Sequence, residues 1–584
     1  MPSEAFLRAL PDTDVPPDHR EDVATAVDDM ASVHAVDADQ YTPTTHDDAM
    51  RLPEPERKAW RDAERSEYRS HVKFGTLGPR VDRCPPGYTP IPTALIYKIK
   101  RDGRYKARLV IRGYRMRSSV DFNETFAPVP RVTSIRLWLA ITIERDYDVV
   151  QADAHTAFLS SPMDTTVYVS VPACFSDDPA TTLDNDPPRI HAMLRGLPGT
   201  KQGSYLWNNR AHASLVSAGF ERAPDDYCLY RHSSIHNLLS VLWVDDFYFS
   251  MTTSVRLGPF RAIFSTLREE LSLQEVTGAN SNEFDILAVR VRRDRANRRA
   301  TLDQSAAISK LLQKAGMTNC NGEHTPLPSK VVFTKNDSPQ TPAETLAIKE
   351  EAKRYRSFVA SLNYLAQWTR VDIAYASGKL SKFMQNPGPE HLKSLKRVMR
   401  YLSKHKERSI MFDFSKPAPL DKVYGYYDAS HADDIDTRRS TMAYTFFYKG
   451  CPISWKSKLH TYVTLSTNNS EYCASAKAAR EATWLKKLLQ FLEHPAAGTT
   501  VDLFSDSAGA IAMNHNPVHH EANKHCDLAD HYAREQVLRG IITISHVPTK
   551  EMIADVLTKP LGKPEFDKFI SLLMTDKPLQ PSNN

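Results

Sequence analysis

The sequence predicts a multidomain protein of mixed α+β and α/β structure. Its 584 residues are enough for several domains, each with its own hydrophobic core. The apolar and aromatic run Val241–Ser250 is interrupted by a turn signal and predicts two strands. Arg131–Arg145 has the amphipathic pattern of a helix. In the last third of the chain, predicted strands and helices that each carry an acidic residue alternate.

The charge of the chain is unevenly distributed. The net charge is only +5, but residues 1–50 are rich in Asp and contain just two cations, Arg8 and Arg20. The remainder is therefore cationic, which favours a polyanionic partner, although a solvated charged surface explains it equally well. The acidic, proline-dotted beginning predicts a disordered leader over residues 1–53.

Cysteine usage and hydropathy indicate an intracellular protein. The seven cysteines are odd in number and scattered, without a Cys-x-x-Cys pair, as expected for reduced thiols. No apolar run reaches membrane-spanning length, and the first residues lack the pattern of a signal peptide. We therefore expect neither secretion nor a membrane partner.

Two adjacent acids, Asp245 and Asp246, lie at the tip of the predicted hairpin Val241–Ser250. Crowding two carboxylates beside apolar strands is costly unless a cation neutralises them. Mg²⁺ is the natural candidate because it is a hard ion that prefers oxygen ligands. A solvent-facing Asp-Asp turn is the simpler alternative for the dipeptide alone.

Other acids lie at the ends of predicted elements. The predicted strand Val149–Asp153 also ends on a carboxylate. Later in the chain, strand, helix, strand and helix carry an acid in turn, and these four acids are Asp428, Glu471, Asp506 and Asp555. This order resembles the ribonuclease H fold, whose four carboxylates hold two metal ions.

Several passages resemble the Pol polyprotein of copia-type (Pseudoviridae) LTR retrotransposons, in its reverse transcriptase and ribonuclease H portion. Trp243–Asp246 is similar to the Tyr-x-Asp-Asp box of reverse transcriptases, and Asp121–Val129 matches the passage DYxETFAPV. The string Ala554–Leu561 matches ADxLTKPL of the copia branch. The resemblance extends from about Trp60 to Leu561.

The resemblance implies a right-hand polymerase with fingers, palm and thumb, followed by a connection and a ribonuclease H-like domain. The expected divisions are fingers and palm at 54–300, a thumb-like segment at 301–345, a connection at 346–419, a ribonuclease H-like domain at 420–565 and a C-terminal tail at 566–584.

By resemblance, Asp153 joins Asp245 and Asp246 as the metal-binding carboxylates of a polymerase. The hairpin Ile96–Gly113 carries seven cations against a single acid. In the family, Lys106 and Arg108 lie where the incoming triphosphate is gripped. An ordinary charged edge hairpin is the alternative.

Three further residues are expected near the nucleotide. Phe158 falls at the steric-gate position below the sugar, although a core aromatic is an equal interpretation. Gln202 and Gly203 are expected beside nucleotide and template. Ala288 replaces the glycine usual in the primer-grip hairpin, and Val371 replaces a proline. Six arginines near this hairpin favour a nearby phosphate backbone: Arg290, Arg292, Arg293, Arg295, Arg298 and Arg299.

The expected function is RNA-directed DNA synthesis with degradation of the RNA of the hybrid. Asp428, Glu471, Asp506 and Asp555 form the expected ribonuclease centre. The implied cofactor is Mg²⁺ or Mn²⁺, two ions per active centre. The implied partners are RNA template, DNA primer or RNA–DNA hybrid, dNTPs, capsid and integrase. The implied location is the cytoplasm, in virus-like particles, and the nucleus.

Two other functions remain open from the residues. A decayed or domesticated element that only binds nucleic acid is favoured by the departures at Ala288, at Val371 and in the Gln202 loop. A structural protein of a virus-like particle is disfavoured because no capsid-like segment is apparent. The histidine-rich segment His515–His531, with Cys526, lacks a second cysteine pair at finger spacing, so zinc is not expected there.

Overall fold

The computed structural model describes residues 42–99, 103–177, 187–277, 282–515 and 528–580. The predicted leader therefore lies outside the described residues up to residue 41. The tip of the basic hairpin at 100–102 and most of the histidine-rich segment lie outside them too. None of the helices in the described part of the chain has an apolar stretch of the length that a bilayer requires.

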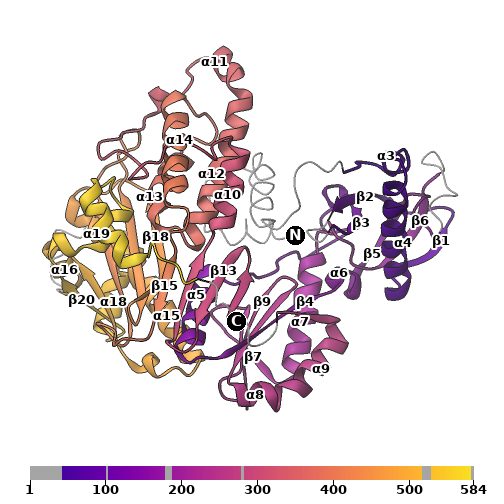
Figure 1. The fold of residues 1–584 in the computed structure, drawn as a ribbon, viewed down its shortest axis with the longest axis horizontal. Coiled ribbons are helices and arrows are strands. Elements are labelled where there is room, and N and C mark those ends of the chain that lie inside the picture. Colours follow the sequence, from indigo (N-terminus) through magenta and orange to yellow (C-terminus); the bar gives the residue numbers. More distant parts are fainter. Residues whose placement is uncertain (1–41, 100–102, 178–186, 278–281, 516–527, 581–584) are drawn as a thin grey trace.

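The first sheet lies at one end of the molecule, beneath helix α4 (Glu56–Phe74) (Figure 1). Its strand order is β1-β6-β5-β2-β3. Trp60 of α4 is fully buried and packs edge-on against Tyr97 and Tyr105 of the β2–β3 hairpin. The strands are β1 (Leu77–Val81), β2 (Ile91–Ile99), β3 (Tyr105–Ile111), β5 (Pro162–Val171) and β6 (Arg189–Arg195).

The expected leader ends earlier than predicted. Helix α3 (His46–Met50) begins at Thr45, whose side chain accepts a hydrogen bond from Asp48 N. His46 is buried and its Nδ1 lies 2.9 Å from Glu64 Oε1 of α4. This buried contact fixes a segment that composition alone assigned to disorder.

The central sheet is antiparallel throughout, in the order β11-β4-β10-β9-β8-β7. Side chains alternate between its two faces. Val241 and Tyr248 pack with helix α5 (Val132–Glu144) in one core, whereas Phe247 and Phe249 pack in another with residues of α7 (Gly203–Ser217) and α9 (Phe260–Leu271). The strands are β4 (Asp148–Ala154), β7 (Phe220–Arg222), β8 (Leu229–His232), β9 (Leu239–Trp243), β10 (Asp246–Met251) and β11 (Leu273–Thr277).

The expected thumb-like and connection segments share one packed unit. Helix α10 (Ser305–Lys314) contacts α14 (Pro389–Lys404), and β15 (Ile410–Asp413) completes the small sheet β12-β13-β14-β15. The expected division at residue 345 therefore crosses a continuous core. The other elements are β12 (Glu283–Ile286), β13 (Val289–Asp294), β14 (Arg299–Asp303), α11 (Pro342–Ala347), α12 (Lys349–Trp368) and α13 (Ala374–Ser381).

The last sheet has the order β18-β17-β16-β19-β20. β18, β17 and β16 are antiparallel, and β19 and β20 run parallel to β16. This topology is the ribonuclease H-like fold, so the predicted mixed α/β multidomain class is confirmed. The elements are β16 (Val423–Ser430), β17 (Thr441–Tyr448), β18 (Cys451–Leu459), α15 (Thr467–Phe491), β19 (Val501–Ser505), α16 (Ala508–His515), α18 (Tyr532–Leu538) and β20 (Ile542–His546).

The expected tail begins inside a helix. Helix α19 (Lys563–Leu573) buries Phe566, Phe569 and Ile570 and packs against the short helix η9 (Ile553–Leu557). The amphipathic spacing of these three residues explains why the helix docks instead of extending into solvent.

Helix α5 joins the central sheet to the last sheet. Arg136 of α5 is buried and donates hydrogen bonds to Ile453 O of β18 at 2.7 Å. Its Nη1 also donates to two carbonyls at the end of α12, Gln367 O at 2.6 Å and Trp368 O at 2.9 Å. The guanidinium carbon lies 3.7 Å from the Trp455 ring centre. The Arg136 side chain thus donates hydrogen bonds to carbonyls of both β18 and α12.

Replacing Arg136 by Ala should lower the free energy of unfolding by about 3 kcal/mol, because three buried carbonyls lose their donor. Chemical denaturation of the whole chain measures this loss. Arg539→Ala is the control: its side chain is mostly exposed and pairs with Glu535 on the same helix turn, so a change below about 0.5 kcal/mol is expected. Equal effects of the two changes would contradict the assigned role of Arg136.

Candidate active sites

The central sheet brings Asp153, Asp245 and Asp246 together. Asp246 begins β10 and lies directly opposite Asp153 of β4 in the antiparallel ladder. Side chains of directly opposed residues extend from the same face of a sheet, about 5 Å apart at Cβ. Asp245 belongs to the turn, and its carbonyl accepts a hydrogen bond from Ala154 N at 2.8 Å.

The tight turn before Asp245 is fixed by helix α7. Val244 has a positive φ of 52°, which is uncommon for a β-branched residue. The indole nitrogen of the buried Trp207 donates a hydrogen bond to Val244 O at 2.5 Å. This contact holds the strained turn, and with it the two acids, against the helix that begins at Gly203.

Electrostatics at this cluster favour a bound cation. Burial, followed by the negative charges of Asp245 and Asp153, raises the pKa of Asp246 well above its usual range. A divalent cation would reverse this penalty by replacing mutual repulsion with attraction. Three carboxylates from two strands are an oxygen-only donor set, which fits Mg²⁺ or Mn²⁺.

The last sheet forms a second acidic cluster at the ends of β16 and β19. The carboxylate oxygens of Asp428, Glu471 and Asp506 lie within 4.8 Å of one another. Asp428 and Glu471 are buried, whereas Asp506 is half-buried. Ala429 N donates to Glu471 Oε1 at 3.2 Å, while Glu471 Oε2 is buried without a hydrogen-bond partner among the described residues. That oxygen is available to a cation.

The fourth predicted acid, Asp555 of η9, joins this cluster through a lysine. Lys559 Nζ lies 2.7 Å from Asp555 Oδ1 and 3.6 Å from Asp428 Oδ2. The Thr558 hydroxyl donates a hydrogen bond to Asp428 Oδ2, and the Thr549 hydroxyl donates to Asp506 Oδ2 at 2.8 Å. Sequence reasoning did not single out these three residues, although Lys559 lies one helical turn after Asp555.

Crowding also perturbs the acids of the second cluster. Burial and the Asp428 charge raise the pKa of Glu471 to about 10. Burial and Asp428 raise the pKa of Asp555 to about 7, with Lys559 acting in the opposite direction. The donor set is again carboxylate oxygen with one orphaned buried atom, so the residues fit divalent cations.

The cations predicted for the triphosphate lie on the outer face of β3. Ala107 and Leu109 are buried, whereas Lys106 is half-buried and Arg108 is exposed. Both cations therefore extend from the same face of the hairpin. The end of β3 contacts the loop before α7, where Ile111 N donates to Pro198 O at 3.0 Å.

Two glycines allow this contact between hairpin and loop. A Cβ on Gly113 would lie 2.0 Å from Gly199 O, and Gly199 has a φ of +90°. The backbones can approach this closely only because both residues lack a side chain. The first sheet and the loop carrying Gln202 are thereby held in one arrangement.

Phe158 and Gly203 are in contact, whereas Gln202 is turned inward. A Cβ on Gly203 would lie 3.2 Å from Phe158 Cδ1, so the half-buried ring covers this glycine. Gln202, which is predicted to lie beside the nucleotide and template, is fully buried. Its amide nitrogen donates to Asp121 O at 2.9 Å and to Thr165 Oγ1 at 3.1 Å. In this structure Gln202 braces the loop.

Comparison with known proteins gives a family match for the part of the chain that contains the first cluster. Residues 80–329 match the family model described as reverse transcriptase (RNA-dependent DNA polymerase). The predicted resemblance to copia-type Pol polyproteins is confirmed.

Plant transposon proteins are similar over most of the chain. The Retrovirus-related Pol polyprotein from transposon TNT 1-94 of Nicotiana tabacum is 32% identical over 88% of this chain and 38% of its own length. The corresponding polyprotein from transposon RE2 of Arabidopsis thaliana is 32% identical over 87% of this chain and 33% of its own. The chain thus spans about a third of the length of these relatives.

A solved structure of the foamy viral protease-reverse transcriptase in complex with RNA/DNA hybrid is also similar. It is 14% identical, covers 94% of this chain and 62% of its own, and has a TM-score of 0.45.

The hairpin predicted to be the primer grip forms without the expected glycine. Leu287 and Ala288 both have positive φ values, 49° and 63°. The Tyr364 hydroxyl of α12 donates a hydrogen bond to Leu287 O. Packing against α12 therefore holds a turn that non-glycine residues rarely adopt.

The arginines near this hairpin are mostly paired within the protein, so the predicted phosphate contact has little support. Of the six, only Arg298 is exposed. Arginines at sheet edges pair readily with nearby carboxylates because their planar fork matches the two oxygens. The pairs are Arg290–Asp285 at 2.9 Å, Arg292–Asp303 at 2.6 Å, Arg293–Asp146 at 3.2 Å, Arg295–Asp148 at 2.8 Å and Arg299–Asp294 at 2.6 Å.

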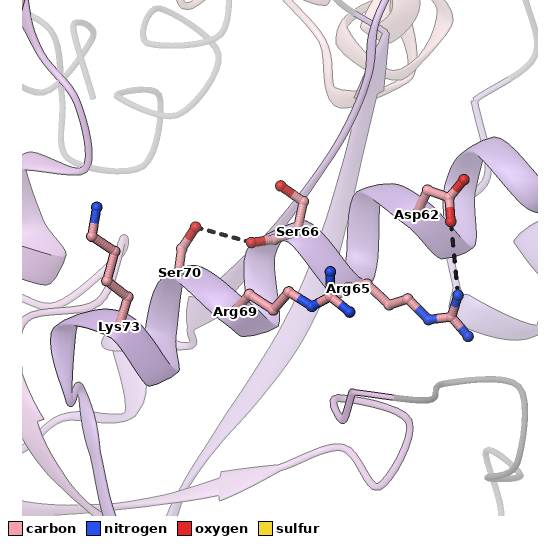
Figure 2. A pocket seen from close by; sticks show the side chains of 6 residues that line it. All are labelled: Asp62, Arg65, Ser66, Arg69, Ser70 and Lys73. Carbon is pink, nitrogen blue, oxygen red and sulfur yellow. Dashed lines mark hydrogen bonds and ion pairs between the residues drawn. The ribbon is translucent and has the colours of Figure 1, made fainter.

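A surface pocket on α4 lies apart from both clusters (Figure 2). It is lined by two ladders at helical spacing, Asp62, Ser66 and Ser70 beside Arg65, Arg69 and Lys73. Arg65 and Arg69 donate hydrogen bonds at 3.0 Å to Asp177, to its carbonyl and its carboxylate respectively. Part of this basic character is therefore neutralised internally.

Without divalent cations, the stability of the protein should fall as pH rises from about 5 to about 9. The raised pKa values of Glu471 and Asp555 mean that the folded chain keeps protons that the unfolded chain releases above its ordinary values of 4.5 and 3.8. Denaturation in EDTA should show a loss of about 2 kcal/mol or more. Mg²⁺ should reverse the loss, and Asp428→Asn should reduce it. A flat pH profile would contradict the assigned repulsion.

Replacing Ala288 by Gly should stabilise the chain by roughly 0.5–1 kcal/mol, because glycine adopts a positive φ without strain. The midpoint of urea denaturation measures the gain. Ala300→Gly, at a buried position within strand β14, should instead destabilise the chain by about 1 kcal/mol. A loss of stability in Ala288→Gly would disprove strain at this turn.

Proposed function

We propose that the chain is an RNA-directed DNA polymerase that also cleaves the RNA strand of RNA–DNA hybrids. The observation that carries this proposal is the position of Asp153 directly opposite Asp246 in the central sheet, with Asp245 in the adjoining turn and close enough for its charge to raise the pKa of Asp246. All three acids lie within the residues that match the reverse transcriptase family model. The chain covers about a third of its relatives' length, so activity, substrates and partners are inferred for this portion alone.

Nucleotide addition is an in-line displacement at phosphorus, and each residue has a distinct task. Asp153, Asp245 and Asp246 would hold the divalent cations. Bound cations would supply charge neutralisation on the triphosphate and a lowered pKa of the primer 3′-hydroxyl. Lys106 and Arg108 extend from one face of the hairpin and suit the triphosphate, Arg108 through its planar fork.

Selection of the sugar would rest on Phe158. Its half-buried ring covers Gly203 and comes from the short helix α6 (Ala157–Ser160), five residues after Asp153. A rigid ring in that place would exclude a ribose 2′-hydroxyl by contact. Gln202 would act at a distance, by fixing the loop that presents Gly203, since its own side chain is buried.

The second cluster would cleave the RNA strand of the hybrid. Asp428, Glu471, Asp506 and Asp555 would hold the cations, and the fold that carries them is ribonuclease H-like. Bound cations would activate water for attack on the phosphodiester. Discrimination against a DNA strand would rest on the 2′-hydroxyl and the shape of the hybrid. RNA template, DNA primer, dNTPs and Mg²⁺ or Mn²⁺ are accordingly the proposed ligands.

Asp245→Asn in the full chain should lower primer extension on an RNA template at least about 100-fold, because a cation ligand loses its charge. Asp428→Asn should lower hybrid cleavage comparably and keep extension. The assays are gel-resolved extension of a labelled DNA primer and cleavage of a labelled RNA strand, both with Mg²⁺.

The two changes serve as reciprocal controls, since each should spare the activity of the other cluster. If the unmodified chain binds hybrid but neither extends nor cleaves across Mg²⁺ and Mn²⁺ concentrations, a decayed element that only binds nucleic acid is the correct interpretation. Extension that survives Asp245→Asn would disprove the proposed polymerase centre.

A further inference from the structure

Three side chains of different chemistry converge behind the second acidic cluster. His460 follows β18, Cys473 lies on α15, and Asp530 lies in the short helix η7 (Leu528–His531). One ligand atom from each lies within 4.8 Å of the others. All three are buried, with exposed fractions of 3%, 0% and 3%. A histidine, a thiol and a carboxylate rarely meet in a core without a common partner.

The orientation of His460 suits metal binding. Its Nδ1 lies 3.0 Å from Tyr462 O and 3.5 Å from Tyr462 N. The carbonyl oxygen is the closer of the two and can only accept, so we assign the ring proton to Nδ1. The lone pair then resides on Nε2, the tautomer found in metal-bound histidines whose other nitrogen donates to a carbonyl. The backbone is fixed as well, since His460 N donates to Ser440 O at 2.8 Å.

The other two ligands are held by independent contacts. Arg480 of α15 donates to Ala529 O at 2.9 Å, which ties η7 to the helix that carries Cys473. The Tyr462 hydroxyl donates a hydrogen bond to Asp530 Oδ2 and lies 3.5 Å from Cys473 Sγ. The relative positions of the three elements are thus set partly by backbone bonds outside the cluster and partly by the Tyr462 hydroxyl within it.

The site has different donor atoms from the carboxylate cluster, and Cys473 and Glu471 face different sides of α15. Cys473 is two residues after Glu471 on α15, and positions two apart on a helix face roughly opposite sides. Glu471 turns towards Ala429 of β16, where the oxygen donors lie. A sulfur, nitrogen and oxygen donor set prefers Zn²⁺, whereas carboxylates alone prefer Mg²⁺.

We propose that His460, Cys473 and Asp530 bind one Zn²⁺ ion, with a fourth position for water or a further ligand. Donors around tetrahedral zinc lie about 3.6 Å apart, so the three side chains must approach one another by up to about 1 Å. Cys473 binds as thiolate, and its proton passes to solvent. The ion joins η7 and the end of β18 to α15, and so fixes the helix that carries Glu471.

The sequence did not predict this site. In the segment His515–His531, the lack of a second cysteine pair at finger spacing argues against zinc. Only Asp530 of the proposed ligands belongs to that segment, and the other two lie 57 and 70 positions earlier. Metal ligands brought together from three separate elements leave no spacing pattern.

Co²⁺ titration of the metal-free full chain, with excess Mg²⁺ present, tests the proposal. Co²⁺ replaces Zn²⁺ in such sites and gives a thiolate charge-transfer band near 300–350 nm with intense tetrahedral d–d bands. We expect one equivalent of Co²⁺ to give both signals and Zn²⁺ to abolish them. The excess Mg²⁺ competes with Co²⁺ for the acidic clusters and itself gives neither signal. The acidic clusters therefore do not contribute to the bands.

Substitution of single ligands identifies the site. Cys473→Ser should abolish the charge-transfer band, and His460→Gln or Asp530→Asn should weaken Co²⁺ binding at least about tenfold. Cys451→Ser, at another buried cysteine of the same domain, should keep one equivalent and the full band. Far-UV circular dichroism measures whether each variant folds. If Cys473→Ser does not fold, the His460 and Asp530 variants still test whether these side chains bind the ion.

Two results would overturn the proposal. Absence of a charge-transfer band in the unmodified chain would leave a hydrogen-bonded cluster of Tyr462, Asp530 and Cys473 without a metal. A band that persists in folded Cys473→Ser would assign the thiolate to another cysteine. By contrast, a rise in thermal stability with Zn²⁺ in the unmodified chain but not in His460→Gln would independently support the proposed zinc site.

Discussion

Helix α5 is the element on which the relative position of the two acidic clusters depends. It is buried along most of its length, with the central sheet on one side and strand β18 of the last sheet on the other. Arg136 fills this junction, and its charge is retained in a dry environment, where burial lowers its pKa to about 9. Glu144 at the end of the helix adds an ion pair with Lys449 at 2.7 Å. A rigid shared helix keeps the spacing between the clusters fixed.

The two clusters share one physical problem and solve it with different scaffolds. In the central sheet, opposed positions of an antiparallel ladder force Asp153 and Asp246 together, and Trp207 holds the turn. In the last sheet, the ends of β16 and β19 meet α15 and η9. In each case the backbone ladder and the apolar core supply the free energy that opposes carboxylate repulsion. The free-energy cost of carboxylate repulsion is greatest at the positions where cations fit.

The sequence indicates where the acids lie along the chain, because each falls near the end of a strand, in a turn or on a helix of recognisable pattern. Whether these acids bind metal stays a prediction. The sequence did not predict what the neighbouring polar residues contact. Gln202 donates hydrogen bonds to Asp121 and Thr165, which lie 81 and 37 positions away in the sequence. No local sequence pattern indicates such pairs. The arginines after Phe284 are also paired with residues that are distant in the sequence, because their carboxylate partners include Asp146 and Asp148. Apolar periodicity indicates which elements exist, whereas long-range polar pairing depends on how they pack.

Lys559 has a consequence for how the second cluster exchanges ions. Its ammonium group lies between Asp555 and Asp428 and is tethered to the chain, so it acts as an intramolecular competitor at high effective concentration. A dissolved divalent ion must displace this tethered charge to reach the acids. By competing with the ion, Lys559 would lower the ion affinity of this cluster, and occupancy would then depend on the free ion concentration of the surroundings.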